Sequence, residues 1–268
     1  MTRPQPPLCV LVLLFTANVV PSRALADFHF DGATLTMSDS PTRMLVIAPH
    51  PDDEILGVGG TMARFTAAGG ELTVLTVAAH MPPLYPKSVH EQTVAEAHQA
   101  HAVVGAKRSV FLDYPAALMD DVRVPEFNGR IMDLVEQVRP HVLLIPYPDR
   151  HVDHRQIFEA AMVCSRPVGV GRGIGLVAAY ETISETHWNA PHIEPNFTPN
   201  WVVDISDSIE TKLEAMACYE SQVHAFPQPR SVEALKALAL FRGSQAGFGY
   251  GEAFHIVRMT TPPEFLGG

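Results

Sequence analysis

The sequence predicts an α/β fold: a single domain built on a Rossmann-like, mostly parallel sheet with helices on both of its faces. Short apolar runs rich in β-branched residues alternate with segments of helical period, and these segments end at glycine or proline. Alternation of this kind is typical of βαβ units. The length of 268 residues fits one large domain whose core needs no disulfides.

The elements follow one another in a regular order up to Arg166. The expected strands are 44–48, 72–78, 109–112 and 142–146, and the expected helices are about 55–68, 89–104 and 126–138. Beyond Arg166 the regular alternation of strands and helices ends. We expect a strand at 176–182, a proline-rich loop at 187–201, a strand at 202–204, helices at about 206–222 and 232–241, and a last strand at 253–259.

The first 26 residues have the pattern of a signal peptide or a shallow membrane anchor. Arg3 precedes an almost uncharged apolar run over 8–20, and small residues follow at 24–26. The run is short for a membrane span. We therefore expect a leader over 1–26 and one domain over 27–268. A genuine leader makes the protein secreted or membrane-associated, with peripheral membrane association; a mere upstream extension makes it cytoplasmic.

Composition narrows the classes of partner. The formal net charge is −10, and lysines and arginines are scattered along the chain, so we expect no nucleic-acid partner. Of the three cysteines, Cys9 lies in the leader. Cys164 and Cys218 form no Cys-x-x-Cys motif, and we expect both to be buried free thiols.

Two clusters of histidine and acid follow the first and the fourth expected strands. They are HPDDE at 50–54 and HVDH at 151–154. In an open parallel sheet, ligands bind at the carboxyl ends of the strands where the strand order reverses, which in the common order is between the first and fourth strands. We therefore expect the two clusters to meet at one edge of the sheet.

The composition of the clusters suits a divalent metal. Imidazole and carboxylate ligands without thiolate favour zinc or another first-row ion. Catalytic zinc usually keeps three protein ligands and one open position. His50 and Asp53 from the first cluster and His154 from the second would provide such a set.

The remaining side chains match the needs of amide hydrolysis. Asp52 is placed to take a proton from metal-bound water, and a protonated His151 to stabilise an oxyanion or hand a proton to the leaving amine. Asp153 could hold His151 in its tautomer and raise its pKa. Glu54 fits a structural carboxylate at a helix start.

These charged residues could also have purely structural roles. Either cluster alone also fits helix capping, and Asp153 with Gln156 fits a capping box. The glycine-rich stretch GVGGTM at 57–62 lacks the dinucleotide pattern, and no serine-hydrolase elbow occurs. His98 and His101 fit a solvated or packed helix face better than a metal site.

The paired stretches APHPDDE at 48–54 and HVDH at 151–154 resemble the motifs of the LmbE/PIG-L family of zinc-dependent N-acetylglucosaminyl deacetylases. Later segments, KLEAMACYESQ at 212–222 and RGSQAGFGYGEAF at 242–254, are similar to that family as well, so the resemblance covers about 41–259. It implies an LmbE-like fold, a zinc cofactor and removal of an N-acetyl group from a glucosaminyl unit. On matching positions it implies the following roles: metal ligands His50, Asp53 and His154; general base Asp52; charge-stabilising pair His151 and Asp153.

The expected function is therefore a metal-dependent hydrolase acting on the N-acetyl or N-acyl group of a small-molecule glycoconjugate. By family analogy the substrate includes glycosylated secondary metabolites such as glycopeptide antibiotic precursors, and the 187–201 loop could hold a bulky aglycone or acyl chain. Its aromatic side chains, Trp188, Phe197 and Trp201, could stack on an acyl or sugar ring, and burial as loop anchors is the competing interpretation. A non-catalytic, metal-stabilised carbohydrate-binding protein is the alternative. First-row metals other than zinc stay open.

Overall fold

The computed structural model describes residues 41–190 and 192–260, so Cys9 and the leader expected over 1–26 lie outside the described residues. The strands are β1 (Arg43–Ala48), β2 (Glu71–Ala79), β3 (Arg108–Pro115), β4 (Val142–Pro146), β5 (Leu176–Tyr180), β6 (Trp201–Asp204) and β7 (Gly251–Met259). The α-helices are α1 (Asp53–Ala67), α2 (Lys87–Val103), α3 (Val124–Val138), α4 (Val152–Cys164), α5 (Ile209–Ala217) and α6 (Val232–Ser244). Short 3-10 helices are η1 (Met119–Asp121), η2 (Gly169–Gly173) and η3 (Thr186–Trp188).

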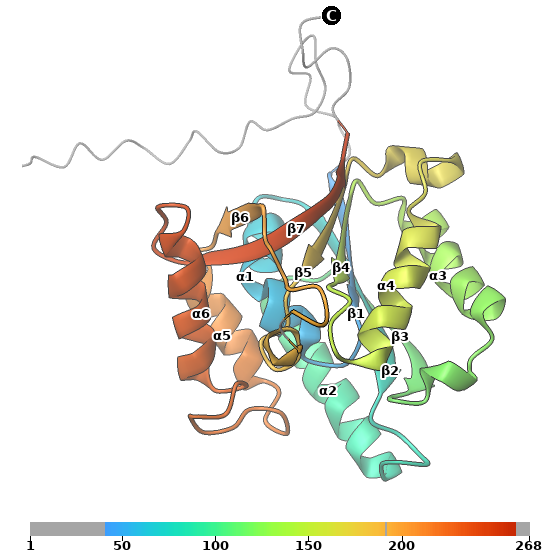
Figure 1. The fold of residues 1–268 in the computed structure, drawn as a ribbon, viewed down its shortest axis with the longest axis horizontal. Coiled ribbons are helices and arrows are strands. Elements are labelled where there is room, and N and C mark those ends of the chain that lie inside the picture. Colours follow the sequence, from blue (N-terminus) through green and yellow to red (C-terminus); the bar gives the residue numbers. More distant parts are fainter. Residues whose placement is uncertain (1–40, 191, 261–268) are drawn as a thin grey trace, which may run out of the picture.

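The seven strands form one sheet in the order β3-β2-β1-β4-β5-β7-β6 (Figure 1). All neighbours from β3 to β5 are parallel, and β7 runs antiparallel to both β5 and β6. The predicted mostly parallel α/β sheet is therefore confirmed. The strand order reverses between β1 and β4, as the sequence predicts, and the carboxyl ends of these two strands open side by side.

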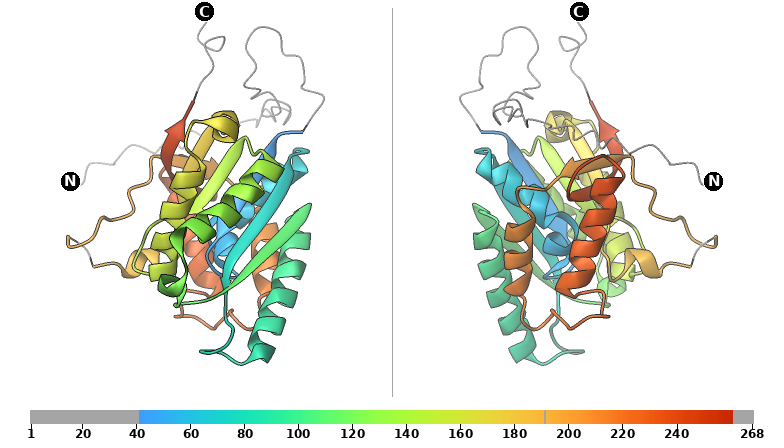
Figure 2. Two further views of the ribbon diagram at one scale, coloured as in Figure 1. Left: turned by 90° about the vertical axis from the view of Figure 1, so that its right-hand side faces the viewer. Right: turned by 90° about the vertical axis from the view of Figure 1, so that its left-hand side faces the viewer.

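Two hydrophobic cores form because alternate residues of each strand face opposite sides of the sheet. On β1, Met44 and Val46 pack into the core under α1, α2, α5 and α6, whereas Leu45 and Ile47 pack into the core under α3 and α4. The two side views show helices on each side of the sheet (Figure 2). The expected covering of both faces is therefore confirmed.

The helices differ from expectation in two places. Helix α4 follows the second charged cluster directly and is absent from the elements expected above. Helix α5 ends at Ala217 rather than near residue 222, because successive turns at Met216–Val223 replace the helical hydrogen bonds. These turns carry the ring of Tyr219 into the core, where it is fully buried.

The glycine-rich stretch of α1 serves close packing. Val58 leaves helical geometry (φ −137°, ψ 16°), so the helix breaks there. A Cβ on Gly57 would overlap the ring of Tyr180, and one on Gly60 would lie 2.8 Å from Ile205. The glycines let neighbouring segments approach the backbone at this break.

Two smaller points complete the fold. Cys164 and Cys218 are free thiols, as expected, although only Cys164 is fully buried. In the part of the chain described here, no helix is both long enough and apolar enough to cross a membrane.

Candidate active site

The loop after β1 brings the first charged cluster to the carboxyl edge of the sheet. Asp52 adopts a left-handed conformation (φ 109°, ψ −29°) that few non-glycine residues occupy. Helix α1 begins at the next residue, with the backbone N–H groups of Ile55 and Leu56 donating to the carbonyl of Asp52 at 3.0 and 2.9 Å. This sharp turn buries the carboxylates of Asp52 and Asp53 at the strand end.

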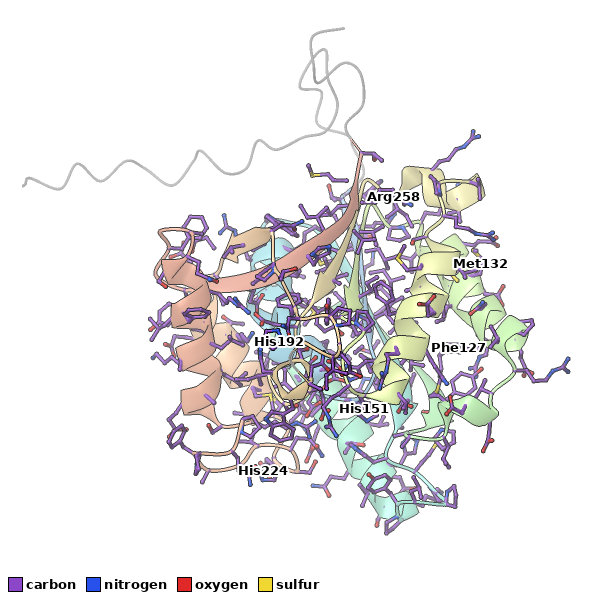
Figure 3. The ribbon with its side chains drawn as sticks, viewed as in Figure 1. Phe127, Met132, His151, His192, His224 and Arg258 are labelled. Carbon is purple, nitrogen blue, oxygen red and sulfur yellow. The ribbon has the colours of Figure 1, made fainter. Side chains whose placement is uncertain are left out.

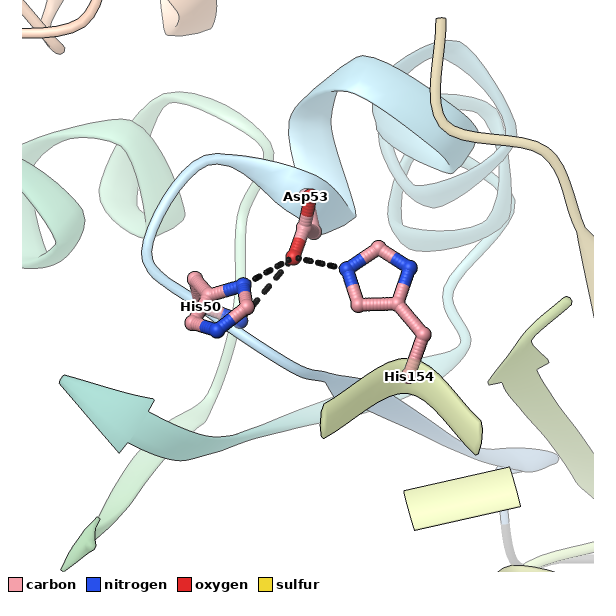
Figure 4. Close-up of side chains that lie close together, drawn as sticks. All are labelled: His50, Asp53 and His154. Carbon is pink, nitrogen blue, oxygen red and sulfur yellow. Dashed lines mark hydrogen bonds and ion pairs between the residues drawn. The ribbon is translucent and has the colours of Figure 1, made fainter. Parts of the chain in front are cut away.

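His50, Asp53 and His154 meet as a compact triangle. Asp53 Oδ2 lies 3.1 Å from His50 Nδ1 and 3.3 Å from His154 Nε2 (Figure 4). One ligand atom from each residue lies within 4.8 Å of the others, and all three residues are buried. The predicted meeting of the clusters that follow β1 and β4 is confirmed.

The triangle has the donor set and spacing of a divalent metal site. Tetrahedral zinc with bonds of about 2.0–2.2 Å separates its ligand atoms by roughly 3.3–3.5 Å, close to the separations observed. His154 Nε2 and Asp53 Oδ1 are buried and have no hydrogen-bond partner. Buried polar atoms left unsatisfied at one point suggest a missing ligand. These three side chains therefore fit zinc or a first-row neighbour.

Asp149, to which the sequence analysis gave no role, fixes the ring of His154. Its Oδ2 lies 3.0 Å from His154 Nδ1 and accepts a hydrogen bond of 2.9 Å from Thr186 Oγ1. Its Oδ1 accepts from the backbone N–H of His151 at 3.0 Å. A carboxylate on the far nitrogen orients a ligating imidazole and raises its basicity. The only signal in the sequence was its place two residues before His151.

Protons occupy the triangle when no metal is bound. Burial disfavours the imidazolium of His50, but hydrogen bonds to Asp153 and Asp53 outweigh it and raise the pKa of His50 to about 9. Burial likewise opposes charge on His154, yet Asp53 and Asp149 raise its pKa to about 10. The same histidines hold the pKa of Asp53 well below its usual value, against the effect of burial. Metal binding must displace these protons.

His151 and Asp153 lie beside the triangle, where α4 begins (Figure 3 labels His151). Asp153 Oδ2 lies 2.8 Å from His50 Nε2 and accepts from the backbone N–H of Ala117 at 2.7 Å, whereas His151 Nδ1 is 3.9 Å away. Asp153 therefore holds His50 rather than His151, and burial lowers the pKa of His151 where the sequence predicted a rise. His151, rather than Asp153, caps the helix: its Nδ1 accepts from the Asp153 N–H. The capping box is not formed, because the side chain of Gln156 bonds to Asp120 instead.

Asp52 faces a cation that the sequence analysis missed. Arg230 Nε, from the segment between α5 and α6, lies 3.3 Å from Asp52 Oδ2. Neither carboxylate oxygen of Asp52 has a hydrogen-bond partner. Burial raises the pKa of Asp52 to about 8, and the guanidinium of Arg230 opposes the rise. No motif or spacing marked Arg230, which is far from Asp52 in the sequence.

Glu54 lies in the first turn of α1, as expected for a structural carboxylate at a helix start. It is fully buried, and its Oε1 accepts a hydrogen bond from the hydroxyl of Tyr219 and lies 3.3 Å from His101 Nε2. His101 is 1% exposed, and its Nδ1 lies 2.7 Å from Ser109 Oγ. The packed-face interpretation of His101 is confirmed.

The 187–201 loop lies between β5 and β6. Phe197 packs edge-on against Tyr147 at 5.1 Å, and Arg242 lies over its ring at 5.6 Å. Trp201 belongs to β6 and packs against Phe254, whereas Trp188 is 57% exposed. Phe197 and Trp201 therefore act as packing anchors of the loop, whereas Trp188 is open to solvent.

Comparisons with known proteins agree with this geometry. The PIG-L family profile, described as GlcNAc-PI de-N-acetylase, matches residues 45–165, which include both clusters. The diacetylchitobiose deacetylase of Thermococcus kodakarensis is 28% identical, with 80% of this chain and 83% of that protein covered. The 1D-myo-inositol 2-acetamido-2-deoxy-alpha-D-glucopyranoside deacetylase of a Mycobacterium species (strain JLS) is 26% identical, with 73% and 79% covered.

A solved structure gives the same result for the fold. The conserved protein TT1542 from Thermus thermophilus superposes with a TM-score of 0.66 and 28% identity, covering 81% of this chain and 95% of that one. The matched segment, the sheet order and the buried histidine–aspartate triangle agree with one another. In sequence and in fold the chain matches the PIG-L/LmbE family of N-acetylglucosamine deacetylases.

Proposed function

We propose that this protein is a zinc-dependent deacetylase that hydrolyses the acetamide of an N-acetylglucosaminyl unit in a small-molecule glycoconjugate. The observation that carries the proposal is the buried triangle of His50, Asp53 and His154 with the unbonded carboxylate of Asp52 beside it. Three ligands and a neighbouring base are what metal-assisted amide hydrolysis requires.

His50, Asp53 and His154 would hold the ion, which when bound supplies Lewis acidity toward the amide carbonyl and a more acidic water. Asp52 acts as the general base. Its carboxylate has no hydrogen bond that would compete for an incoming proton, and its raised pKa, due to burial, brings its basicity near neutral pH. Arg230 keeps a counter-charge next to it.

His151 stabilises the developing oxyanion. Its Nδ1 accepts the N–H of Asp153, so the neutral ring carries its proton on Nε2. Burial, together with the charges of His50 and His154, lowers the pKa of His151 to about 4, and the ring is neutral at pH 7. A neutral N–H can donate a hydrogen bond to an oxyanion without first losing a proton. Asp153, held by Ala117, balances the charge of His50.

The two relatives described above take the acetyl group from glucosamine units attached to quite different groups, a second sugar in one and an inositol in the other. We infer that this protein shares the acetamide-bearing sugar and differs in what the sugar is attached to. Exposed Trp188 on the β5–β6 loop supports a bulky aglycone or acyl chain, as in a glycopeptide antibiotic precursor. The leader expected over 1–26 favours an exported or membrane-associated substrate.

A substrate panel tests the proposal. Purified protein, stripped of metal with a chelator and reloaded with zinc, is incubated with diacetylchitobiose, an N-acetylglucosaminyl inositol and a glycopeptide carrying N-acetylglucosamine, and free amine is measured. We expect amine release that needs the metal. Binding of these sugars without amine release, under zinc, cobalt, manganese or iron, would favour the non-catalytic carbohydrate-binding alternative.

A further inference from the structure

The backbone of Asp52 is held in an unfavourable conformation. A left-handed geometry at a non-glycine residue is unfavourable and persists only where the surroundings enforce it. The carbonyl side of Asp52 is held by the first turn of α1, through the N–H groups of Ile55 and Leu56. The amide side is held by Glu54, because the Asp52 N–H donates to Glu54 Oε2 at 3.3 Å.

Glu54 is itself fixed from two other elements. Tyr219, in the turn after α5, donates its hydroxyl to Glu54 Oε1, and His101 of α2 lies 3.3 Å from the same oxygen. All three side chains are at most 1% exposed. A carboxylate buried to this degree is costly unless its partners satisfy it. Tyr219 and His101 thus hold Glu54 Oε1, and Glu54 Oε2 stays available to the Asp52 amide.

We propose that Glu54 is a positioning residue that locks the backbone of Asp52, and so aims the Asp52 carboxylate at the water between metal and substrate. The aiming rests on the proposed function, whereas the locking of the backbone does not. Tyr219 and His101 contribute by holding Glu54 in place. A base displaced by about 1 Å can lose on the order of 100-fold in rate while binding stays unchanged.

Glu96 provides a matched control. It is also a buried carboxylate, 7% exposed, and it joins α2 to the turn after α5 by accepting from the backbone N–H of Ser221 at 3.1 Å and from Ser221 Oγ at 2.6 Å. Its hydrogen bonds go to Ser221 and Gln92 rather than to Asp52. Glu54→Met and Glu96→Met therefore remove similar buried acceptors, and only the first releases the Asp52 amide.

The expected results separate positioning from stability. In Glu54→Met, kcat falls by about tenfold or more, while KM and bound zinc stay at wild-type values. Glu96→Met unfolds at lower urea concentration than the wild type but keeps kcat within about twofold. Tyr219→Phe removes the hydroxyl that holds Glu54 Oε1 but leaves Glu54 in place, so its kcat should lie between those of Glu96→Met and Glu54→Met. Equal kcat in the Glu54 and Glu96 variants would overturn the proposal.

Two further measurements cover failure to fold and absence of turnover. If Glu54→Met does not fold, Glu54→Asp and Glu96→Asp replace the pair; the shorter acid at 54 cannot span Asp52 and Tyr219 together, and wild-type kcat in it would refute the locking.

Amide hydrogen exchange at Asp52 needs no substrate. We expect slow exchange in the wild type and in Glu96→Met and fast exchange in the Glu54 variants. Slow exchange in the Glu54 variants would refute the locking even if no sugar is hydrolysed.

Discussion

Arg230 places its Nε 3.3 Å from the Oδ2 of Asp52, at a carboxylate that has no hydrogen bond of its own. Three consecutive acids crowd this turn, and Asp53 and Glu54 each disfavour charge on Asp52. Arg230 is the neighbour that favours the charged form most, and Ser184 and Gln222 hold its guanidinium at 3.3 and 3.1 Å. The segment between α5 and α6 therefore takes part in the electrostatics of the site.

Arg230→Gln should raise the pKa of Asp52, because burial and the neighbouring acids then act without opposition. Less carboxylate is present at neutral pH, so we expect kcat/KM at pH 7 to fall on the order of 10-fold or more. The acid limb of the pH–rate profile should move to higher pH than in the wild type. Arg155→Gln, which breaks an exposed pair with Glu194, is the control and should leave the profile unchanged.

Asp52→Asn and His154→Ala should separate catalysis from metal binding. The asparagine cannot take a proton, so we expect full zinc content and a loss of roughly 100-fold to 10,000-fold in kcat. His154→Ala removes one of three ligands, so zinc content should fall together with activity. His98→Ala, on the helix face near Phe111, is the control for losing a histidine. Unchanged zinc in His154→Ala would remove His154 from the ligand set.

Much of the site could be predicted because local patterns and sheet topology act together. The clusters at 50–54 and 151–154 each follow a strand, and parallel pairing of β1 with β4 is enough to bring them together. The antiparallel β7 and the length of α5 depend on packing between distant segments, which periodicity does not report.

The contacts of Arg230 and Tyr219 could not be predicted from the sequence for a related reason. Arg230 meets Asp52, and Tyr219 meets Glu54, only after α5 has docked on α1. Helix capping and a buried network require the same acids at a helix start, so the sequence alone could not distinguish an exposed Glu54 from a buried one. Glu54 can be buried because the hydroxyl of Tyr219, 165 residues later in the chain, donates a hydrogen bond to it.

Glu181 should make the protein sensitive to acid. Burial would raise its pKa, but hydrogen bonds from His187 and Arg242 outweigh burial and hold the pKa below its ordinary value of 4.5. A carboxylate whose folded pKa is depressed stabilises the fold above its unfolded pKa, and this contribution is lost as pH falls through the folded value. We expect stability to decline below about pH 4.5, measured by urea denaturation, and to decline less steeply in Glu181→Gln. Parallel curves for the two proteins would contradict this assignment.

The break in α1 should depend on a buried ion pair. Glu252 of β7 accepts the backbone N–H groups of Gly60 and Thr61 at 2.9 and 2.7 Å, groups that the break at Val58 leaves without helical partners. Lys212 of α5 donates to Glu252 at 2.6 Å and to the carbonyl of Leu56 at 2.8 Å. The pair therefore satisfies both sides of the break.

Removing one partner leaves the other charge buried. We expect Lys212→Met to lower the free energy of unfolding by about 3–5 kcal/mol, seen as a lower urea midpoint. Lys236→Met breaks an exposed pair with Glu210 and should change the free energy of unfolding by less than about 1 kcal/mol. Because Lys212→Met with Glu252→Gln leaves no unpaired charge, the double variant should lose less than the sum of the single variants. Strict additivity would mean that the two side chains support the break independently.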